Sequence, residues 1–210
     1  MTPKRVAKAK KADTVVTADD LRTRKPGHAP DERLESRELY RGPIVTLYRD
    51  KVRFPDGSQN DFDIARHPGA SAIVPFLNDP EGDEPQILMM RQYRYAAGGY
   101  LYEIPAGRLD AGETPRECAI RELKEETGCT AEKFEPLTTF LTTPGFTDEV
   151  IHLFLATGLN HGQHEREADE FVELVVMRLS EALELIRDGK ITDAKTIIAL
   201  MYAAGFKTGA

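Results

Sequence analysis

The segment Gly107–Cys129, GRLDAGETPRECAIRELKEETGC, constrains the fold of this chain more than any other stretch. Thr114 can cap a helix and form a capping box with Glu117, and the proline between them suits the first helical position, where no backbone N–H is needed. Gly128 is a natural stop, because glycine adopts the left-handed conformation that ends many helices. The segment therefore predicts a loop followed by a helix over Pro115–Thr127.

Three carboxylates fall on one face of this predicted helix. At about 100° per residue, Glu125 and Glu126 lie close to Glu122, and the apolar positions form a separate flank. Like charges four residues apart cost an isolated helix about 0.2–0.5 kcal/mol per pair, so this cluster does not stabilise the helix. It is suited to binding a divalent cation, because Mg²⁺ takes hard oxygen ligands and leaves part of its shell to substrate phosphates. The alternative is a solvated acidic face balanced by Arg116, Arg121 and Lys124.

The spacing of the whole segment resembles that of a known family. Gly107 is followed after five residues by Glu113, and after seven more by the run Arg121–Gly128 and then an apolar residue, Cys129. This pattern is similar to the Nudix box of the Nudix hydrolases at every defining position. The resemblance implies an α/β/α sandwich around a mixed sheet and an enzyme that uses Mg²⁺, Mn²⁺ or another divalent cation.

The same resemblance implies a set of oxygen ligands for that cation. The expected metal ligands are Glu122 and Glu126 first, then Glu125 and the backbone carbonyl of Ala106. Arg121 is expected to orient these carboxylates from beside them, through Glu113 or Glu125. Bound Mg²⁺ would polarise phosphoryl oxygens, activate a water and hold both groups of a diphosphate in line.

Four features outside the box are similar to those of the ADP-ribose pyrophosphatase subfamily. Glu103–Gly107 resembles the E-x-P-A-G motif that leads into its box. Pro144, sixteen positions beyond the glycine that ends the box helix, resembles its downstream proline. Arg91–Arg94 is similar to its substrate-side strand end, and Asp169–Glu173 to its segment with a late acidic residue. The resemblance covers about residues 40–202 and implies hydrolysis of ADP-ribose to AMP and ribose 5-phosphate.

Roles for individual residues follow from this resemblance. The candidate substrate-binding residues are Arg94, Arg91, Glu103 and Pro144, and Arg121 and Glu125 join the catalytic set. Arg94 can contact phosphate or stack on adenine, since a guanidinium does both, and a surface salt bridge is its alternative role. Glu170 best matches the loop acid that acts as general base, with Glu167 second. Their alternative is a solvent-facing carboxylate in a polar loop.

Two other functions compete with this one. A sister enzyme would keep the chemistry and cleave GDP-mannose or another nucleotide sugar. A nucleotide-sensing module that does not catalyse would be expected to have lost box carboxylates, which are all present here. A nucleic-acid partner is disfavoured by the charge of the chain, which is −7. The first 33 residues hold nine Lys or Arg against five Asp or Glu, so the remaining residues carry a net charge of −11.

The chain divides into three parts by composition. Residues 1–33 form a basic tail poor in large apolar side chains, for which we expect little order. Residues 34–66 are β-rich and predict a hairpin subdomain. Residues 67–210 hold the Nudix-like domain, in which strands around two or three helices predict an α/β or α+β class. Members of the subfamily exchange N-terminal strands between the chains of a homodimer, so the resemblance gives residues 34–66 that role.

Cysteine content and hydropathy predict a cytoplasmic setting. Cys118 and Cys129 lie about three helical turns apart, too far for a disulfide without distortion, which favours reduced thiols. No run approaches the roughly 18 apolar residues of a membrane span, and no apolar stretch follows the basic N-terminus.

Overall fold

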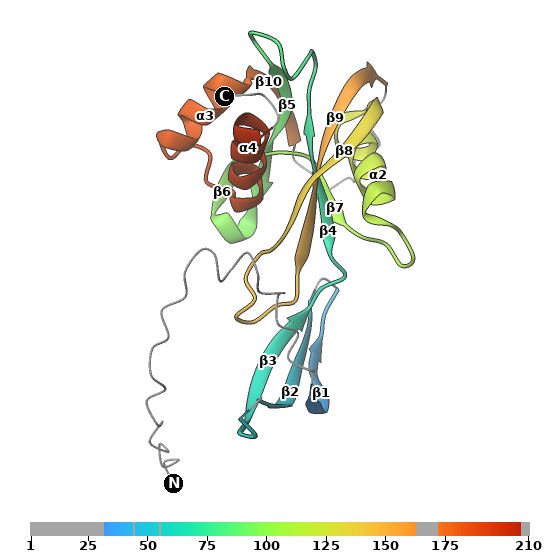
Figure 1. Cartoon of the computed structure of the whole chain (residues 1–210), viewed down its shortest axis with the longest axis vertical. Helices are drawn as coiled ribbons and strands as arrows, with labels where there is room; N and C mark the ends of the chain where they lie inside the picture. Colours follow the sequence, from blue (N-terminus) through green and yellow to red (C-terminus); the bar gives the residue numbers. More distant parts are fainter. Residues whose placement is uncertain (1–31, 44, 55, 163–171, 207–210) are drawn as a thin grey trace.

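The structure, a computed structural model, describes residues 32–43, 45–54, 56–162 and 172–206. Within these residues the strands form sheets of order β1-β2-β3, β10-β5-β6 and β7-β4-β9-β8 (Figure 1). The strands are β1 (Arg33–Arg41), β2 (Thr46–Arg53), β3 (Gln59–Arg66), β4 (Ala70–Pro75), β5 (Gln86–Arg94), β6 (Gly99–Glu103), β7 (Ala106–Arg108), β8 (Cys129–Leu141), β9 (Val150–His161) and β10 (Val172–Arg178). The helices are α2 (Pro115–Thr127), α3 (Leu179–Arg187) and α4 (Ala194–Phe206), with a 3₁₀ turn η1 (Tyr95–Ala97).

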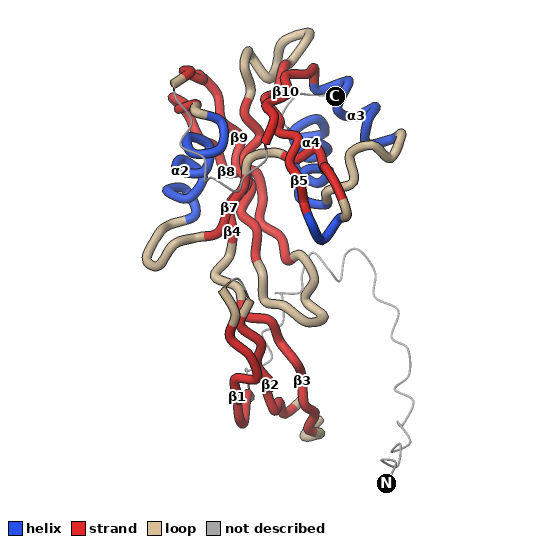
Figure 2. The backbone as a smooth tube through the Cα atoms, turned by 180° about the vertical axis from the view of Figure 1, so that it is seen from behind, coloured by secondary structure: helices blue, strands red, loops and turns tan. Residues whose placement is uncertain are grey.

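The sheet β7-β4-β9-β8 is the middle layer of a sandwich. Strands β4 and β9 pair in parallel, whereas their outer neighbours pair antiparallel, so the sheet is mixed. Alternate residues of β4 enter two cores: Ile73 packs with Leu123 of α2, and Val74 packs with Leu200 of α4. Helix α2 lies on one side of this sheet and α3 and α4 on the other (Figure 2). The expected α/β/α architecture is confirmed.

The sheet β1-β2-β3 extends away from the sandwich (Figure 1). Strands β2 and β3 form the hairpin indicated by the sequence, paired without interruption from Thr46–Arg66 to Arg53–Gln59. Strand β1 adds a third, antiparallel strand whose nine residues are all exposed. The sheet meets the loop before β9 through a backbone hydrogen bond from Ala65 N to Phe146 O.

Helix α2 begins and ends where the sequence predicts. The Thr114 hydroxyl accepts from Glu117 N, the Glu117 carboxylate accepts from Thr114 N, and Gly128 has φ of 74°. Helix α3 is capped by a different group. Ser180 is not its cap: the helix begins at Leu179, and the Glu181 carboxylate accepts from Arg178 N in place of a Ser hydroxyl.

Two further expectations concern the thiols and the ends of the chain. Cys118 and Cys129 are both buried free thiols. The predicted tail lies outside the described residues except for Glu32 and Arg33. Among the helices of the described part, none has the length and apolar character needed to cross a membrane.

Candidate functional site

The face of α2 that carries the acidic residues packs against β7. Glu122 and Glu126 are 8% and 4% exposed, and Glu126 Oε2 accepts a hydrogen bond of 2.9 Å from Ala106 N. The Glu122 carboxylate lies against Gly107, where a side chain of even one carbon would place its Cβ 1.9 Å from Glu122 Oε1. The glycine is therefore required for close approach, and the loop and helix of the box meet through these two carboxylates.

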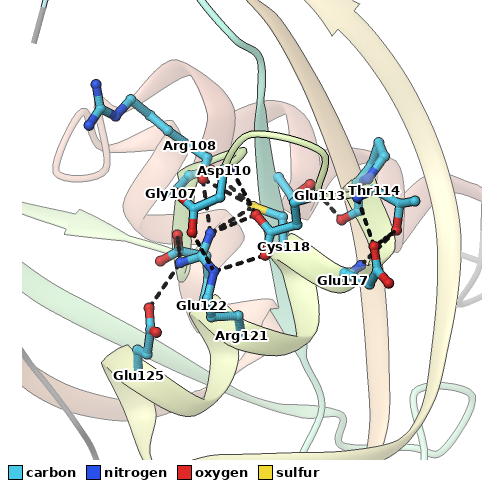
Figure 3. A network of polar contacts seen from close by, with 12 residues as sticks. Gly107, Arg108, Asp110, Glu113, Thr114, Glu117, Cys118, Arg121, Glu122 and Glu125 are labelled. Atoms are coloured by element: carbon cyan, nitrogen blue, oxygen red, sulfur yellow. Dashed lines mark hydrogen bonds and ion pairs between the residues drawn. The ribbon is translucent and has the colours of Figure 1, made fainter.

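Arg121 joins the carboxylates around it into one network (Figure 3). Its guanidinium donates two 2.9 Å hydrogen bonds to Glu113, one of 2.7 Å to Glu122 and one of 2.9 Å to Glu125. A further bond reaches Arg108 O at 3.0 Å, which ties the guanidinium to the loop backbone. Because a planar guanidinium offers five donors, a single arginine can hold three carboxylates.

This network changes the proton affinity of its members. The hydrogen bonds from Arg121 hold the pKa of Glu113 at about 2, below its ordinary value of 4.5. The same contacts, with Glu113 first, raise the pKa of Arg121. Burial raises the pKa of the Cys118 thiol to about 11. The carboxylate is therefore ionised and the thiol protonated near neutral pH, which makes Cys118 a poor nucleophile.

The chemistry of the acidic side chains fits a hard divalent cation. Glu122, Glu125 and Glu126 offer carboxylate oxygens along one helix face, the donor type that Mg²⁺ prefers. Within the described ranges, no three acidic, His or Cys side chains are already grouped around one point. Glu122 and Glu125 are instead drawn to the Arg121 guanidinium, so binding a cation would require these carboxylates to turn from it.

A second charged cluster joins β5, β6 and α4. Glu103 is 1% exposed, and its two oxygens accept from Arg94 Nε at 2.8 Å and Nη2 at 3.0 Å. Lys195 Nζ donates to the same carboxylate and, at 3.0 Å, to Asp193. Burial opposes ionisation of Glu103, but the bonds from Arg94 and Lys195 outweigh it and lower its pKa. The paired charges fix Arg94, whose own pKa is raised by Glu103 and, to a smaller extent, by Glu126.

Sequence reasoning missed the part that α4 takes in this cluster. Thr196 Oγ1 accepts from Ile104 N at 3.0 Å and donates to Asp193 Oδ2 at 2.6 Å, so the start of α4 anchors the strand end that leads to Ala106. Asp193 accepts from Thr196 N at 3.0 Å, a local contact at the start of α4, whereas Lys195 and Glu103 are 92 residues apart in sequence. No local pattern signals such a pair.

Comparison with known proteins decides the family. Residues 67–200 match the model described as the NUDIX domain. The chain belongs to the Nudix family. Residues 32–63 match a second model, described as the nucleoside diphosphate sugar hydrolase N-terminal domain. The structure is also similar to a crystal structure of an ADP compounds hydrolase, with TM-score 0.74, 23% identity and coverage of 85% of this chain and 95% of that one, which confirms the Nudix fold.

Curated relatives of this Nudix protein carry several names. A "methanol dehydrogenase activator" of Bacillus methanolicus is 41% identical over 82% of this chain and 91% of the relative. An "ADP-ribose pyrophosphatase" of Bacillus subtilis is 39% identical with the same coverage. A "GDP-mannose pyrophosphatase" of Yersinia enterocolitica is 36% identical over 64% of this chain and 73% of the relative.

The Nudix structure separates the remaining predicted site residues. Arg91 is three positions from Arg94 on β5, so it points to the opposite face, where it contacts Glu173 at 3.0 Å and stacks over Tyr100 at 4.1 Å. Pro144 is exposed in the loop that bonds to Ala65 of β3. Neither is brought to Arg94. The candidate general bases, Glu170 and Glu167, lie outside the described residues.

Proposed function

We propose that the chain hydrolyses the diphosphate bond of nucleoside diphosphate sugars, with ADP-ribose as substrate and AMP and ribose 5-phosphate as products. One observation carries the proposal. The buried carboxylates Glu122 and Glu126 pack on β7, and Arg94, held by Glu103, is close enough to Glu126 for their charges to interact. Ligands for a cation and a guanidinium suited to phosphate are therefore neighbours.

The box residues would hold a divalent cation. Glu122 and Glu126 are the proposed principal ligands, with Glu125 and the Ala106 carbonyl as further oxygens. A bound Mg²⁺ would supply positive charge to the diphosphate and lower the pKa of an attacking water. Arg121 aligns the carboxylates, and its bonds to Glu113 remain available when Glu122 and Glu125 turn toward a cation.

The substrate side is assigned to β5 and β6. Arg94 binds a phosphate oxygen, and Glu103 acts as its positioning residue because its carboxylate is already occupied by Arg94 and Lys195. Arg91, on the opposite face of β5, and Pro144, in the loop before β9, keep a substrate role only if a second chain completes the site. Glu170, with Glu167 as the second candidate, is proposed to accept the proton of the attacking water.

Two substrates compete within this proposal. The relative named for ADP-ribose is 39% identical and matches more of this chain than the relative named for GDP-mannose, which is 36% identical. We therefore place ADP-ribose first and GDP-mannose second. Product release from ADP-ribose, GDP-mannose, UDP-glucose and NADH, measured with Mg²⁺ and again with chelator, tests this order. Chelator-insensitive release would contradict the metal proposal, and binding without turnover of any member would favour a nucleotide sensor.

Glu126→Gln tests the metal ligands directly. Removing one ligand charge should lower kcat about 100- to 1000-fold, because the charge that stabilises the transition state is lost with the cation. Glu117→Gln is the matched control on the same helix, since glutamine also serves in a capping box. It should keep wild-type kcat and Tm. Equal activity of Glu126→Gln and the wild type would remove Glu126 from the site.

We also infer a homodimer that exchanges its N-terminal strands. The sheet β1-β2-β3 and its connecting turns expose large apolar side chains that the described part of the chain leaves uncovered: Leu34, Leu39, Tyr40, Val45 and Phe54. Large apolar side chains exposed together on one small sheet favour an interaction site. A partner chain that covers it would place its own sandwich beside β1.

A further inference from the structure

Gln92 in the middle of β5 has a buried amide oxygen with no partner. The residue is 5% exposed, and its Oε1 is the buried side-chain polar atom for which the described residues offer no hydrogen bond. A buried acceptor left unpaired costs free energy, and such groups in native structures call for an explanation. A ligand that donates a hydrogen bond to this oxygen would supply one.

The position of Gln92 relates it to the proposed site. Gln92 and Arg94 are two residues apart on β5, so their side chains share one face of the sheet. Glu103 of β6 is paired with Met90 of β5, so its side chain lies on the same face of the sheet as those of Gln92 and Arg94. Its hydrogen bonds to Arg94 require this placement. Gln92 is therefore more buried than Arg94, whose side chain is 40% exposed, and lies on the same face of β5. Arg94 is the residue of this face whose charge interacts with Glu126.

The chemistry of a diphosphate sugar limits what can reach this oxygen. The diphosphate carries no hydrogen at neutral pH and can only accept, so Arg94 suits it and the Gln92 oxygen does not. The linked sugar is dense in hydroxyl donors and is joined directly to the phosphate that Arg94 would hold. We propose that Gln92 Oε1 accepts a hydrogen bond from a hydroxyl of that sugar and so makes the site selective for diphosphates that carry one. This inference rests on the proposed function.

Binding of two ligands to matched variants tests the proposal. ADP-ribose and ADP share the nucleoside diphosphate, but only ADP-ribose has the second sugar. We would titrate both, in the presence of chelator to prevent turnover, into wild type, Gln92→Met and Gln86→Met. Gln86 is an exposed glutamine on the same strand, so it receives the same substitution away from the site. KM for ADP-ribose with Mg²⁺ is measured for each variant.

The proposal expects a selective loss. Gln92→Met should bind ADP-ribose about five- to tenfold more weakly, the loss of one neutral hydrogen bond, with ADP binding unchanged. Its KM for ADP-ribose should rise by the same factor, and its Tm without ligand should equal or exceed that of wild type, because an unpaired acceptor has been removed. Gln86→Met should match wild type throughout.

Other results would overturn it. Equal ADP-ribose affinity in Gln92→Met and wild type, or parallel losses for ADP and ADP-ribose, would mean that the amide does not contact the second sugar. A lower Tm of Gln92→Met together with weaker binding of both ligands would make Gln92 a structural residue. A wild-type protein that binds neither ADP-ribose nor ADP would also contradict the proposal. Chelator-sensitive hydrolysis with an unchanged KM would reject this inference and leave the proposed function intact.

Discussion

At the scale of single residues, Gly107 shows how a missing side chain shapes the site. A Cβ at this position would meet the Glu122 carboxylate at 1.9 Å, whereas a Cβ at Gly99 would meet no atom within 4 Å. The Glu122 carboxylate is the far end of a flexible side chain, so Gly107→Ala should move it without unfolding the protein. A displacement of about 1 Å at a reacting centre costs about a hundredfold in rate. We expect that loss in kcat with Tm within a few degrees, while Gly99→Ala keeps wild-type kcat; equal rates for both variants would contradict the placement.

Glu113 makes a prediction about acid stability. Its pKa is about 2 in the folded chain against 4.5 ordinarily, so the unfolded chain binds a proton more readily as pH falls. The stabilising contribution is therefore complete above about pH 4.5 and is lost as pH decreases toward 2. In Glu113→Gln this contribution is absent. The difference in Tm between wild type and variant should be constant from pH 7 to 5 and shrink between pH 4.5 and 2. A difference that does not change with pH would show that Arg121 does not hold this carboxylate.

At the scale of elements, the start of α4 supports the strand end that carries Glu103 and Ile104. Thr196 is fully buried, and its hydroxyl bonds to both Ile104 N and Asp193. Thr196→Val keeps the shape, leaves Ile104 N unpaired and removes one of the bonds to Asp193, which should lower the free energy of unfolding by about 1–3 kcal/mol. Urea denaturation measures the change. Thr196→Ser retains the hydroxyl and should lose less; a larger loss in the serine variant would show that packing of the methyl group, not the hydroxyl, matters.

The elements also differ in how far the sequence predicts them. Both ends of α2 were correct because Thr114, Glu117 and Gly128 act within a few residues of the helix. The start of α3 is harder to place from the sequence, because Ser180 is of a common capping type, but the Glu181 carboxylate bonds to Arg178 N instead. The clustering of the box carboxylates was predictable from helical spacing. The fixing of Arg94 through Glu103 and Lys195 was not, because tertiary packing brings distant segments together.

At the scale of the whole molecule, the N-terminal sheet and the sandwich are joined through a small set of polar contacts. Arg66 bridges Asp50 of β2 and Asp148 of the loop before β9, and Ala65 bonds to Phe146 O. These contacts set the direction in which the sheet extends but cover little of β1. A strand with nine exposed residues needs another surface to bury its apolar side chains, because burial of apolar area is the main term that stabilises packed sheets.

The proposed dimer gives the last prediction. Leu39 lies on β1 and Met201 on α4, and both are exposed apolar side chains. If β1 packs on a partner chain, Leu39→Lys places a charge in the interface and should convert dimers to monomers in sedimentation equilibrium, because burial of an unpaired charge is costly. Met201→Lys is the matched control and should stay dimeric. Activity should fall with dissociation if the partner completes the substrate site, and should persist if each sandwich works alone. A wild-type monomer at all protein concentrations would contradict the exchange of N-terminal strands.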